Sequence, residues 1–565
     1  RADKPFGRDR RKYGTLELGD IKPSLEGRWI VDTLDGEVEV TTVFELLKEE
    51  SENYKPETAS EITGVSAKVI EQTAKIFADA DPGMIYAGYA SCKWLHGDLL
   101  QRAMLLLLAL TGSTGKEGGG LQIANSPNAR GLTQFGFSDV GPAFRLISST
   151  TWDYDHADMK ELNEKIYGND LAEKFDRYYK KSIEEDWFPD YSKNGWKMGI
   201  FAGNNGANWR ATGSTWRKTA FEELETIVSL APDMGVTSLY SDYVLPIAHH
   251  YERNDLMLQS RVPYLQVLNE AVPPLGEAVD DWEANRRLAE AISRRAKERN
   301  IKPIQDAVDG RTVRRDYTKT LELYTMGGRV NNSKDVAQFI INASHGIPKI
   351  SFEELSQKGI VKVEGVENTM WEKDESPYHN EIVKSVKKKL PYETFTGRQQ
   401  FYIDHEWFIE FGETLPTFKE PLEIDDFPLR MMMGHARHGI HSTWRDDSFL
   451  LSLQRGEPDI YVNPDDAINR GVEDGDMIRI YNTAGEFFAM AHVSSGIQPG
   501  MLFMYHGWDP KMFKGGKNFS EVIPTGGLIK PTSMAGDYGH LGYQPLAFAP
   551  NQTYKDFTCD FEKSA

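Results

Sequence analysis

The sequence predicts an α/β protein in which two Rossmann-like α/β units are followed by a small C-terminal β-barrel. Two stretches, 56–195 and 196–300, each combine a short apolar strand with a segment at helical spacing. A third stretch, 426–565, alternates short strands with turns at 482–486 and 494–500, which is typical of a barrel. We expect 1–55 to be the end of a preceding domain and 301–425 to be a linker with insertions.

Composition narrows the class of protein. The 565 residues are 40% apolar and 11% aromatic, which is enough to build the cores of several domains. The net charge of −20 argues against nucleic acid as a partner, because phosphate binding needs a basic surface. The longest apolar run is 103–110, far short of the roughly 18 residues that cross a bilayer, so we expect no membrane span.

Cysteine usage limits the metal chemistry of this chain. Its two cysteines, Cys92 and Cys559, form no CxxC pair, so the chain by itself cannot hold a four-cysteine cluster or zinc site. The sequence leaves open whether these two cysteines form a disulfide. Because the chain starts at Arg1 without a methionine or a signal peptide, we expect it to be a piece of a longer protein.

The first α/β unit places polar side chains between a strand and a helix. A short strand is predicted at 84–86 and an almost wholly apolar, buried helix at 96–110. Lys93 and His96 lie between them, and ligands of open α/β sheets bind beyond the strand ends. We therefore take both as candidate catalytic residues. The alternatives are a lysine that reaches solvent and a structural histidine.

Two further segments, 144–168 and 171–191, predict acidic surface helices with aromatic faces. We interpret these faces as a candidate partner contact.

The second α/β unit carries the residues of a nucleotide site. A strand at 198–201 runs into Gly203, Asn204 and Asn205, a turn whose backbone N–H groups can hold a phosphate. The next strand, 227–230, is followed by Asp233, whose carboxylate can accept two N–H donors from a guanine edge, and then by Thr237 and Asp242. Ordinary turn and cap roles are the alternative for these residues.

A dense group of donors follows the first strand of the predicted barrel, which spans 428–433. Such density matches a large polar ligand with phosphates or fused polar rings, because guanidinium groups and hydroxyls bind phosphate oxygens. The alternative is a solvated loop. The group consists of His435, Arg437, His438, His441, Ser442, Thr443 and Arg445.

These motifs together resemble the molybdopterin oxidoreductases, the dimethyl sulfoxide reductase family. The resemblance rests on GHARHGIHS, on NPDDAINRGVEDGDMIRIYN, and on the Thr237 to Pro246 pattern T-x-x-x-x-D-x-V-L-P, and it covers most of the chain. It is closest to the type II branch, which holds nitrate, selenate and chlorate reductases and the ethylbenzene and steroid side-chain dehydrogenases.

The resemblance implies a cofactor, bis-molybdopterin guanine dinucleotide with one molybdenum, and a double-psi-like barrel as its cofactor domain. A 4Fe-4S cluster and the residue that ligates the metal would come from a part N-terminal to this chain. Lys93 and His96 would border the substrate cavity. The residues expected to bind the cofactor are Gly203, Asn204, Asn205, Asp233, Thr237, Asp242, His435, Arg437, His438, His441, Ser442, Thr443, Asn463, His506, Trp508, Asn551 and Gln552.

The activity implied is that of a catalytic α subunit. Lys93 resembles a lysine in the equivalent loop of the hydrocarbon-hydroxylating dehydrogenases. We therefore expect oxygen-independent hydroxylation of a hydrocarbon or steroid side chain, with water as the oxygen source. The alternative within the class is an oxyanion reductase for nitrate, selenate or chlorate. Partners would be an iron–sulfur β subunit and a haem b γ subunit, and the location would be the periplasm.

Two other classes stay open. The chain could be a non-catalytic relative that kept the fold as a binding module. It could also be an ordinary nucleotide-binding α/β protein, although such a protein has no need of the C-terminal barrel motif.

Overall fold

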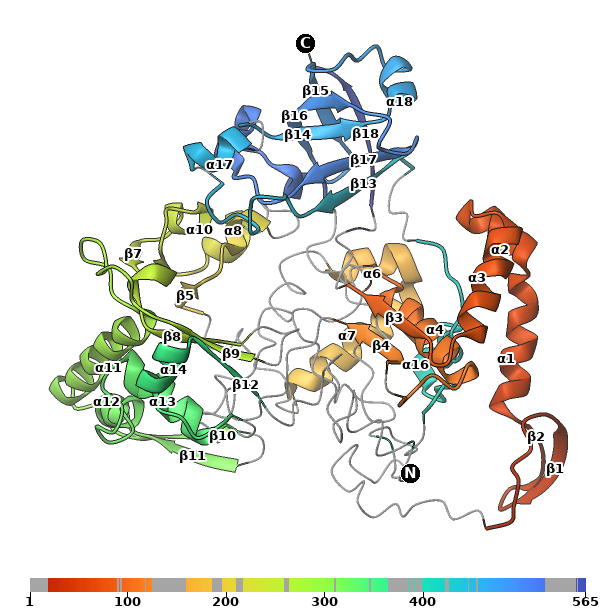
Figure 1. The fold of residues 1–565 in the computed structure, drawn as a ribbon, viewed down its shortest axis with the longest axis horizontal. Helices are drawn as coiled ribbons and strands as arrows, with labels where there is room; N and C mark the ends of the chain where they lie inside the picture. Colours follow the sequence, from red (N-terminus) through yellow and green to blue (C-terminus); the bar gives the residue numbers. More distant parts are fainter. Residues whose placement is uncertain are drawn as a thin grey trace.

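The structure is a computed structural model, and its described residues form a series of packed units (Figure 1). The described residues are 19–88, 91, 94–116, 118–123, 159–184, 196–209, 217–258, 264–308, 311–344, 347–363, 386, 392, 399–421, 426–445, 447–453, 456–523, 555 and 557–564.

The N-terminal segment forms a hairpin, three α-helices and a short 3-10 helix. Strands β1 and β2 pair antiparallel, with Arg28 opposite Thr41. Thr42 caps α1 by accepting a hydrogen bond from the Glu45 N–H at 3.1 Å. The elements are β1 (Arg28–Thr33), β2 (Gly36–Thr41), α1 (Val43–Ser51), η2 (Glu52–Tyr54), α2 (Pro56–Thr63) and α3 (Ala67–Asp79).

The first α/β unit has the predicted order of strand, helix and strand. β3 (Met84–Ala87) and β4 (Gly120–Ile123) pair in parallel, and α4 (Gly97–Leu110) connects them. The expected burial of the helix is wrong, because Leu107 is 50% exposed, and Tyr86 of β3 is 51% exposed. The buried residues of α4 are Gly97, Leu99 and Leu108.

The predicted acidic helices are α6 (Met159–Tyr167) and α7 (Asn169–Glu184). Two aromatic side chains of α7 pack inside the chain, since Phe175 is 1% and Tyr179 is 3% exposed. These two side chains are therefore not available for the expected partner contact.

The second α/β unit is a parallel sheet in the order β5–β6–β7, with α11 packed beside it (Figure 1). Because the strands are parallel, the turns after β5 and β6 lie at one edge of the sheet. The elements are β5 (Met198–Ala202), α8 (Gly206–Trp209), the π-helix η5 (Arg217–Phe221), β6 (Thr226–Ala231), α10 (Val236–Leu239), β7 (Tyr243–Pro246), η6 (His250–Glu252) and α11 (Asp281–Glu298).

The interval 301–425 differs from the expected linker, because its first part folds around a core of its own. β12 pairs with β9, which pairs with β8, and Leu265, Ile341 and Leu355 pack below them at 0%, 2% and 0% exposure. The elements are β8 (Asp255–Leu258), β9 (Tyr264–Leu268), β10 (Ile304–Val308), β11 (Arg311–Arg315), η7 (Tyr317–Lys319), α12 (Thr320–Tyr324), α13 (Ser333–Ala343), α14 (Phe352–Lys358) and β12 (Ile360–Lys362).

The later part of that interval returns to the first α/β unit. It contains α16 (Glu406–Glu410), which lies beside α4 (Figure 1). The Arg102 guanidinium of α4 donates to the backbone oxygens of Glu413 at 2.7 Å and Thr414 at 2.8 Å. We call residues 399–421 the return segment.

The C-terminal part is a closed six-stranded barrel in the order β13–β17–β14–β16–β15–β18, as the sequence predicted. Alternating burial along β16 and β17 sends one side chain in two into a core that includes Met431, Phe487 and Leu502 at 0% exposure. The elements are β13 (Leu429–Gly434), α17 (Ser448–Leu453), β14 (Asp459–Val462), α18 (Pro464–Ile468), β15 (Met477–Tyr481), β16 (Glu486–Val493), β17 (Met501–Tyr505), η8 (Pro510–Met512), η9 (Lys514–Gly516), η10 (Phe519–Val522) and β18 (Thr558–Lys563).

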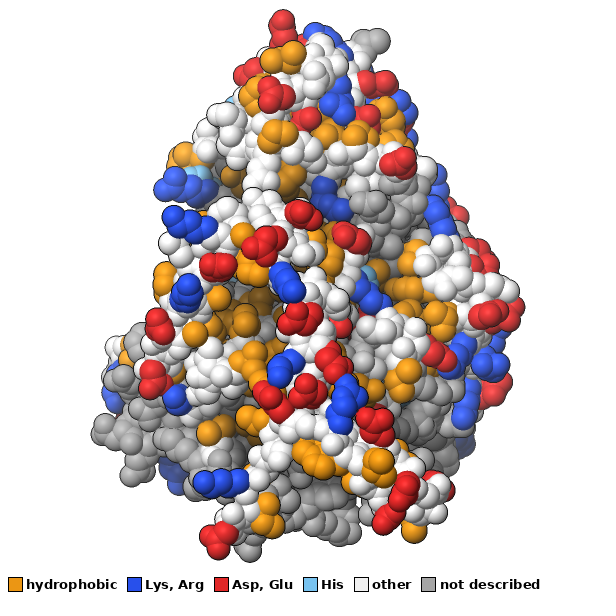
Figure 2. Space-filling view, turned by 90° about the vertical axis from the view of Figure 1, so that its right-hand side faces the viewer, with side chains coloured by type: hydrophobic (Ala, Val, Ile, Leu, Met, Phe, Trp, Pro, Cys, Tyr) orange, Lys and Arg blue, Asp and Glu red, His pale blue; other side chains and the backbone are white. Residues whose placement is uncertain are grey.

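The surface carries charges of both signs. Figure 2, which views the right-hand side of Figure 1, shows acidic and basic side chains intermixed, with apolar side chains between them. On that face the net negative charge is therefore not gathered into one acidic patch. Among the described residues, no helix is both long enough and apolar enough to cross a bilayer.

Candidate functional site

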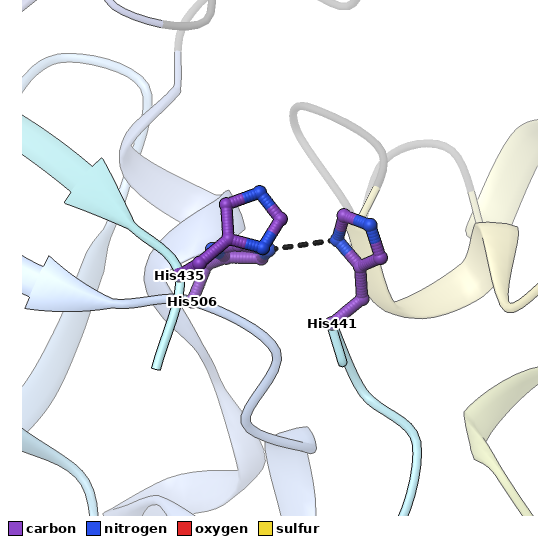
Figure 3. A group of neighbouring side chains, drawn as sticks. All are labelled: His435, His441 and His506. Carbon is purple, nitrogen blue, oxygen red and sulfur yellow. Dashed lines mark hydrogen bonds between the residues drawn. The ribbon is translucent and has the colours of Figure 1, made fainter. Parts of the chain in front are cut away.

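Two parallel strands of the barrel bring histidines together from distant parts of the sequence. β13 and β17 are in register, with Gly434 opposite Tyr505, so the residues that follow them, His435 and His506, lie side by side. Their ring centroids are 4.5 Å apart, and His441 from the next loop lies 5.1 Å from His506 (Figure 3). The distance in sequence between His435 and His506 gives no hint of this contact, which results from the strand pairing.

Hydrogen bonds fix the protonation of His506. Its Nδ1 is 2.6 Å from the backbone oxygen of Gly434, which can only accept, so Nδ1 carries the proton. Its Nε2 then accepts from His441 Nδ1 at 2.9 Å. The pKa of His506 is lowered to about 4, mainly by burial and also by the neighbouring His435, His441 and Arg445, while the bond to Gly434 opposes this lowering. The imidazole is therefore neutral at physiological pH.

Three imidazoles in this arrangement can serve either a metal ion or a polar organic ligand. The ligand atoms of His435, His441 and His506 lie within 4.8 Å of one another. A metal ion needs a lone pair from each ring, and the bond between His441 and His506 already uses one nitrogen of each ring. His435 and His441 are exposed, so their remaining donors and acceptors are accessible to a large ligand.

The loop that carries His441 is held in a rare backbone conformation. His441 and Trp444 have positive φ values of 52° and 58°. Arg445, which is 2% exposed, donates to the backbone oxygens of His441 at 3.2 Å and His506 at 2.5 Å. Its guanidinium also lies over the Trp508 ring, 4.7 Å from the centroid, and burial lowers its pKa. We call residues 435–445 the histidine loop.

Asn205 joins the second α/β unit to the histidine loop. Its Nδ2 donates to Ser442 Oγ at 2.9 Å, and its Oδ1 accepts from the Thr237 N–H at 2.9 Å and the Thr237 hydroxyl at 3.1 Å. The Thr237 Oγ1 in turn accepts from the Ala207 N–H at 3.2 Å. Three residues that the sequence predicted as cofactor-binding therefore meet at one point, although 237 positions separate Asn205 from Ser442.

The glycine turn and Asp233 lie at the same sheet edge. Gly203 takes a φ of 59°, which allows the chain to turn directly after β5. Asp233 follows β6, is partly exposed, and accepts from the Ser238 hydroxyl through its backbone oxygen at 3.3 Å. Gly235 packs against Asn205, because a Cβ at this position would lie 3.2 Å from Asn205 Nδ2.

Other predicted residues occupy structural positions. The Asp242 carboxylate accepts from the Ile227 N–H at 2.7 Å, so it lies at the start of β6, away from the edge that carries Asp233. Asn463 caps α18 through Oδ1 and donates to the Ile497 oxygen at 2.8 Å. Trp508 is 2% exposed and belongs to the barrel core. Arg437 and His438 are exposed on the histidine loop, where Thr443 donates to the Ile440 oxygen through its backbone N–H.

Of the two candidate catalytic residues, the structure describes His96, which lies in the first α/β unit and not on the histidine loop. His96 precedes α4, is 18% exposed, and places Nδ1 3.6 Å from Glu413 Oε1. Lys93 lies outside the described residues, and so do Asn551 and Gln552.

Sequence reasoning missed a polar seam between the second α/β unit and the barrel. Asn208 donates to Asp509 Oδ1 at 3.0 Å, and Asn518 donates to Asn208 Oδ1 at 2.7 Å. The Arg217 guanidinium pairs with Glu521 at 3.1 Å, with both side chains buried. The sequence signals are Asp509 before η8 and Asn518 before η10, which ordinary capping also explains.

Two family models match the chain over the units that build this site. Residues 39–291 match the model described as molybdopterin oxidoreductase, and residues 429–536 match the molydopterin dinucleotide binding domain. The chain belongs to the molybdopterin oxidoreductase family. The expected fold class and the expected molybdopterin dinucleotide cofactor are thereby confirmed.

Relatives of this oxidoreductase chain are type II α subunits. It is 34% identical to perchlorate reductase subunit alpha of Dechloromonas aromatica, over 97% of this chain and 59% of the relative. It is 32% identical to dimethylsulfide dehydrogenase subunit alpha of Rhodovulum sulfidophilum, over 97% and 60%. It is 33% identical to respiratory nitrate reductase subunit alpha of Haloferax mediterranei, over 97% and 57%. The chain thus spans about three fifths of each of these relatives.

A solved structure shares the fold of this molybdopterin oxidoreductase chain. Acetylene hydratase from Pelobacter acetylenicus superposes with a TM-score of 0.59 over 92% of this chain and 66% of that chain, at 17% identity. At that identity the likeness shows the fold alone.

The residues present fit a molybdopterin dinucleotide. His435 and His441 offer exposed ring nitrogens, and the turn at Asn205 meets Ser442 beside them. The Asp233 carboxylate at the same sheet edge suits a guanine base. Fused polar rings, phosphates and a base can therefore each find groups of matching chemistry within the described residues.

Proposed function

We propose that this chain is part of the catalytic α subunit of a molybdenum enzyme that reduces an oxyanion. The observation that carries the proposal is the 34% identity to a perchlorate reductase α subunit over 97% of the chain. The nitrate reductase α subunit of Haloferax mediterranei supports it at 33% over the same share. These names favour the oxyanion alternative over the hydrocarbon hydroxylation that Lys93 suggested.

The cofactor would lie between the second α/β unit and the barrel. One dinucleotide would contact the Gly203 turn, Asn205 and Asp233, and the histidine loop would hold pterin rings and phosphates. When bound, the molybdenum cofactor supplies two-electron redox chemistry with transfer of an oxygen atom. The role of the protein is to bind, orient and exclude water. The neutral His506, donating through Nδ1 to Gly434, keeps the orientation of His441 fixed.

A second candidate is the opposite direction of reaction, oxidation of a small sulfur compound. The dimethylsulfide dehydrogenase α subunit of Rhodovulum sulfidophilum, 32% identical over 97% of the chain, favours it. The two reactions use the same cofactor and differ in the direction of electron flow. They are therefore separated by turnover and not by the geometry of the cofactor site.

Partners and location follow from the same proposal. The relatives are named as α subunits, which indicates assembly with other chains. We propose an iron–sulfur β subunit as electron donor, a haem b γ subunit beyond it, a 4Fe-4S cluster in the remainder of the α subunit, and a periplasmic location.

The test uses the full-length protein purified with its natural partner subunits. Molybdenum and pterin are first quantified. Oxidation of reduced viologen is then measured with perchlorate, chlorate, nitrate and selenate, and dye reduction with dimethylsulfide, ethylbenzene and a sterol side chain. We expect turnover with an oxyanion. Dye reduction by a hydrocarbon alone would restore the hydroxylase, and a protein without molybdenum or pterin would leave a binding module.

A further inference from the structure

A wholly buried carboxylate lies outside the cofactor site, on the return segment. Glu413 is 0% exposed and follows α16 by three residues. Burial of an ionised carboxylate is unfavourable unless cations or hydrogen-bond donors compensate it. Its position therefore has to be explained by the groups that face it.

Three basic side chains from two parts of the chain face Glu413. His96 Nδ1 lies 3.6 Å and Lys419 Nζ 3.3 Å from its Oε1. Arg102 binds the backbone oxygen of Glu413, and the Glu413 and Asp98 carboxylates oppose the lowering of the Arg102 pKa by burial. The Glu413 carboxylate therefore lies between His96 on one side and the basic side chains of Arg102 and Lys419.

The return segment holds Glu413 in a fixed place. Trp407 packs on Phe175 of α7 with ring centroids 5.9 Å apart, and Phe411 meets Tyr167 of α6 edge-on at 5.1 Å. Thr417 donates to Glu50 of α1 at 2.6 Å. Because the segment is tied to three elements, the carboxylate cannot follow His96 if that side chain moves.

We propose that Glu413 is a positioning residue for His96. The carboxylate faces Nδ1, so it turns Nε2 to the opposite side of the ring and favours the tautomer or charge state with a proton on Nδ1. His96 itself is the residue placed between β3 and α4, where ligands of open sheets bind. The role of His96 in turnover rests on the proposed function; its pairing with Glu413 does not.

The competing explanation is that Glu413 serves Lys419 and Arg102 alone and stabilises the return segment. The two explanations predict different properties of His96. If Glu413 positions His96, it raises the pKa of His96, and the effect of a Glu413 substitution on turnover depends on the presence of that histidine. If Glu413 is structural, neither is expected.

The first experiment measures the titration of His96 without using turnover. The full-length complex is treated with diethyl pyrocarbonate across pH, and carbethoxylation of the His96 peptide is followed by mass spectrometry. We expect Glu413→Gln to lower the pH midpoint by about one unit, the usual effect of losing one nearby opposite charge. The variant retains the other charged or titratable groups around this site, which are Arg102, Lys419, Asp98 and the buried His405. Glu410→Gln is the matched control, because it removes the same charge from the same segment but pairs with Lys174 at 2.5 Å.

Glu413→Asp keeps the charge that Lys419 faces but withdraws it from His96, and it provides a second test if Glu413→Gln does not accumulate. We expect a smaller downward shift of the midpoint with Glu413→Asp. Midpoints that equal the wild-type value in the variants obtained would overturn the pairing.

The second experiment is a double-mutant cycle in viologen-linked turnover. We expect Glu413→Gln to lower kcat about tenfold, the lower end of the usual effect of losing a group that orients a functional histidine, and to have no further effect in a His96→Gln background. If the two substitutions lower kcat independently, so that the losses multiply in the double variant, Glu413 has a structural role and the proposal is overturned.

The outcomes also separate this proposal from the proposed function. Unchanged turnover of His96→Gln would overturn the positioning role while the oxyanion function stands. A wild-type complex inactive on every oxyanion would remove the proposed function, and carbethoxylation would still decide the pairing.

Discussion

Gly507 decides whether the histidine loop can lie against the strand end that carries His506. A Cβ at Gly507 would lie 2.0 Å from the backbone oxygen of His441, and its φ is 97°. We expect Gly507→Ala to displace the loop, to cost roughly 2–4 kcal/mol and to reduce molybdenum content. The control is Gly500→Ala, at a φ of 80° with nothing within 4 Å, for which we expect a loss of about 1 kcal/mol and full metal content. Equal losses in the two variants would argue against the close approach.

His506 gives the metal-free protein a defined pH dependence. Burial holds the pKa of its folded form at about 4, below the ordinary value of 6.5. As the pH falls below 6.5 the unfolded chain takes up this proton first, so the free energy of unfolding decreases by roughly 3 kcal/mol between pH 6.5 and 4 and is constant above. Denaturant unfolding of wild type and His506→Asn, compared at each pH, should show curves that converge at low pH. Parallel curves would contradict a depressed pKa.

Single residues also show where sequence reasoning reaches its limit. Asn205 and Asp233 were predictable, because polar residues after parallel strands gather at one sheet edge. Asp242 follows the same motif, yet its carboxylate binds the Ile227 N–H at 2.7 Å at the other end of the strand. The family pattern gives residue types and order, whereas the direction of a side chain depends on the local turn.

At the scale of elements, a buried ion pair joins the π-helix η5 of the second α/β unit to η10 of the barrel. Arg217 and Glu521 are 8% and 6% exposed. Arg217→Met leaves the Glu521 carboxylate buried without this cation, and we expect a loss of roughly 3–5 kcal/mol. Adding Glu521→Gln should restore part of that loss. Thermal unfolding measures both, and Arg294→Met, from a pair that is 58% and 46% exposed, should lose no more than about 1 kcal/mol. If Arg217→Met melts like Arg294→Met, the seam does not hold the barrel.

Element positions were more predictable than element burial. Strand alternation placed β15 to β17 correctly, because a period of two marks one buried face. The apolar run of α4 predicted full burial, but Leu107 is 50% exposed. Periodicity reports which face of an element is apolar, and which neighbours cover that face depends on tertiary contacts. The same reason hides the pairs Arg217–Glu521 and His96–Glu413, whose members are far apart in the sequence.

At the scale of the whole molecule, the chain order does not follow the spatial order. The interval 301–425 first builds a unit with β8 and β9, and its later part then returns to α4 and α7. The first α/β unit is therefore completed by residues that follow the second α/β unit in sequence. The candidate catalytic residue His96 and the proposed cofactor site are therefore supported by different parts of the chain. A substitution can then affect one of them without the other.

Trp407 provides the test of that arrangement. It is 3% exposed and packs on Phe175 of α7, so truncation would leave a cavity between the return segment and the first α/β unit. We expect Trp407→Ala to lose roughly 3–5 kcal/mol and to lower the first thermal transition. Because the cofactor site lies on other elements, molybdenum content should stay near the wild-type level. Trp29→Ala, at 42% exposure, is the control and should change the transition little. A Trp407→Ala protein that loses its molybdenum would show that the return segment also stabilises the cofactor site.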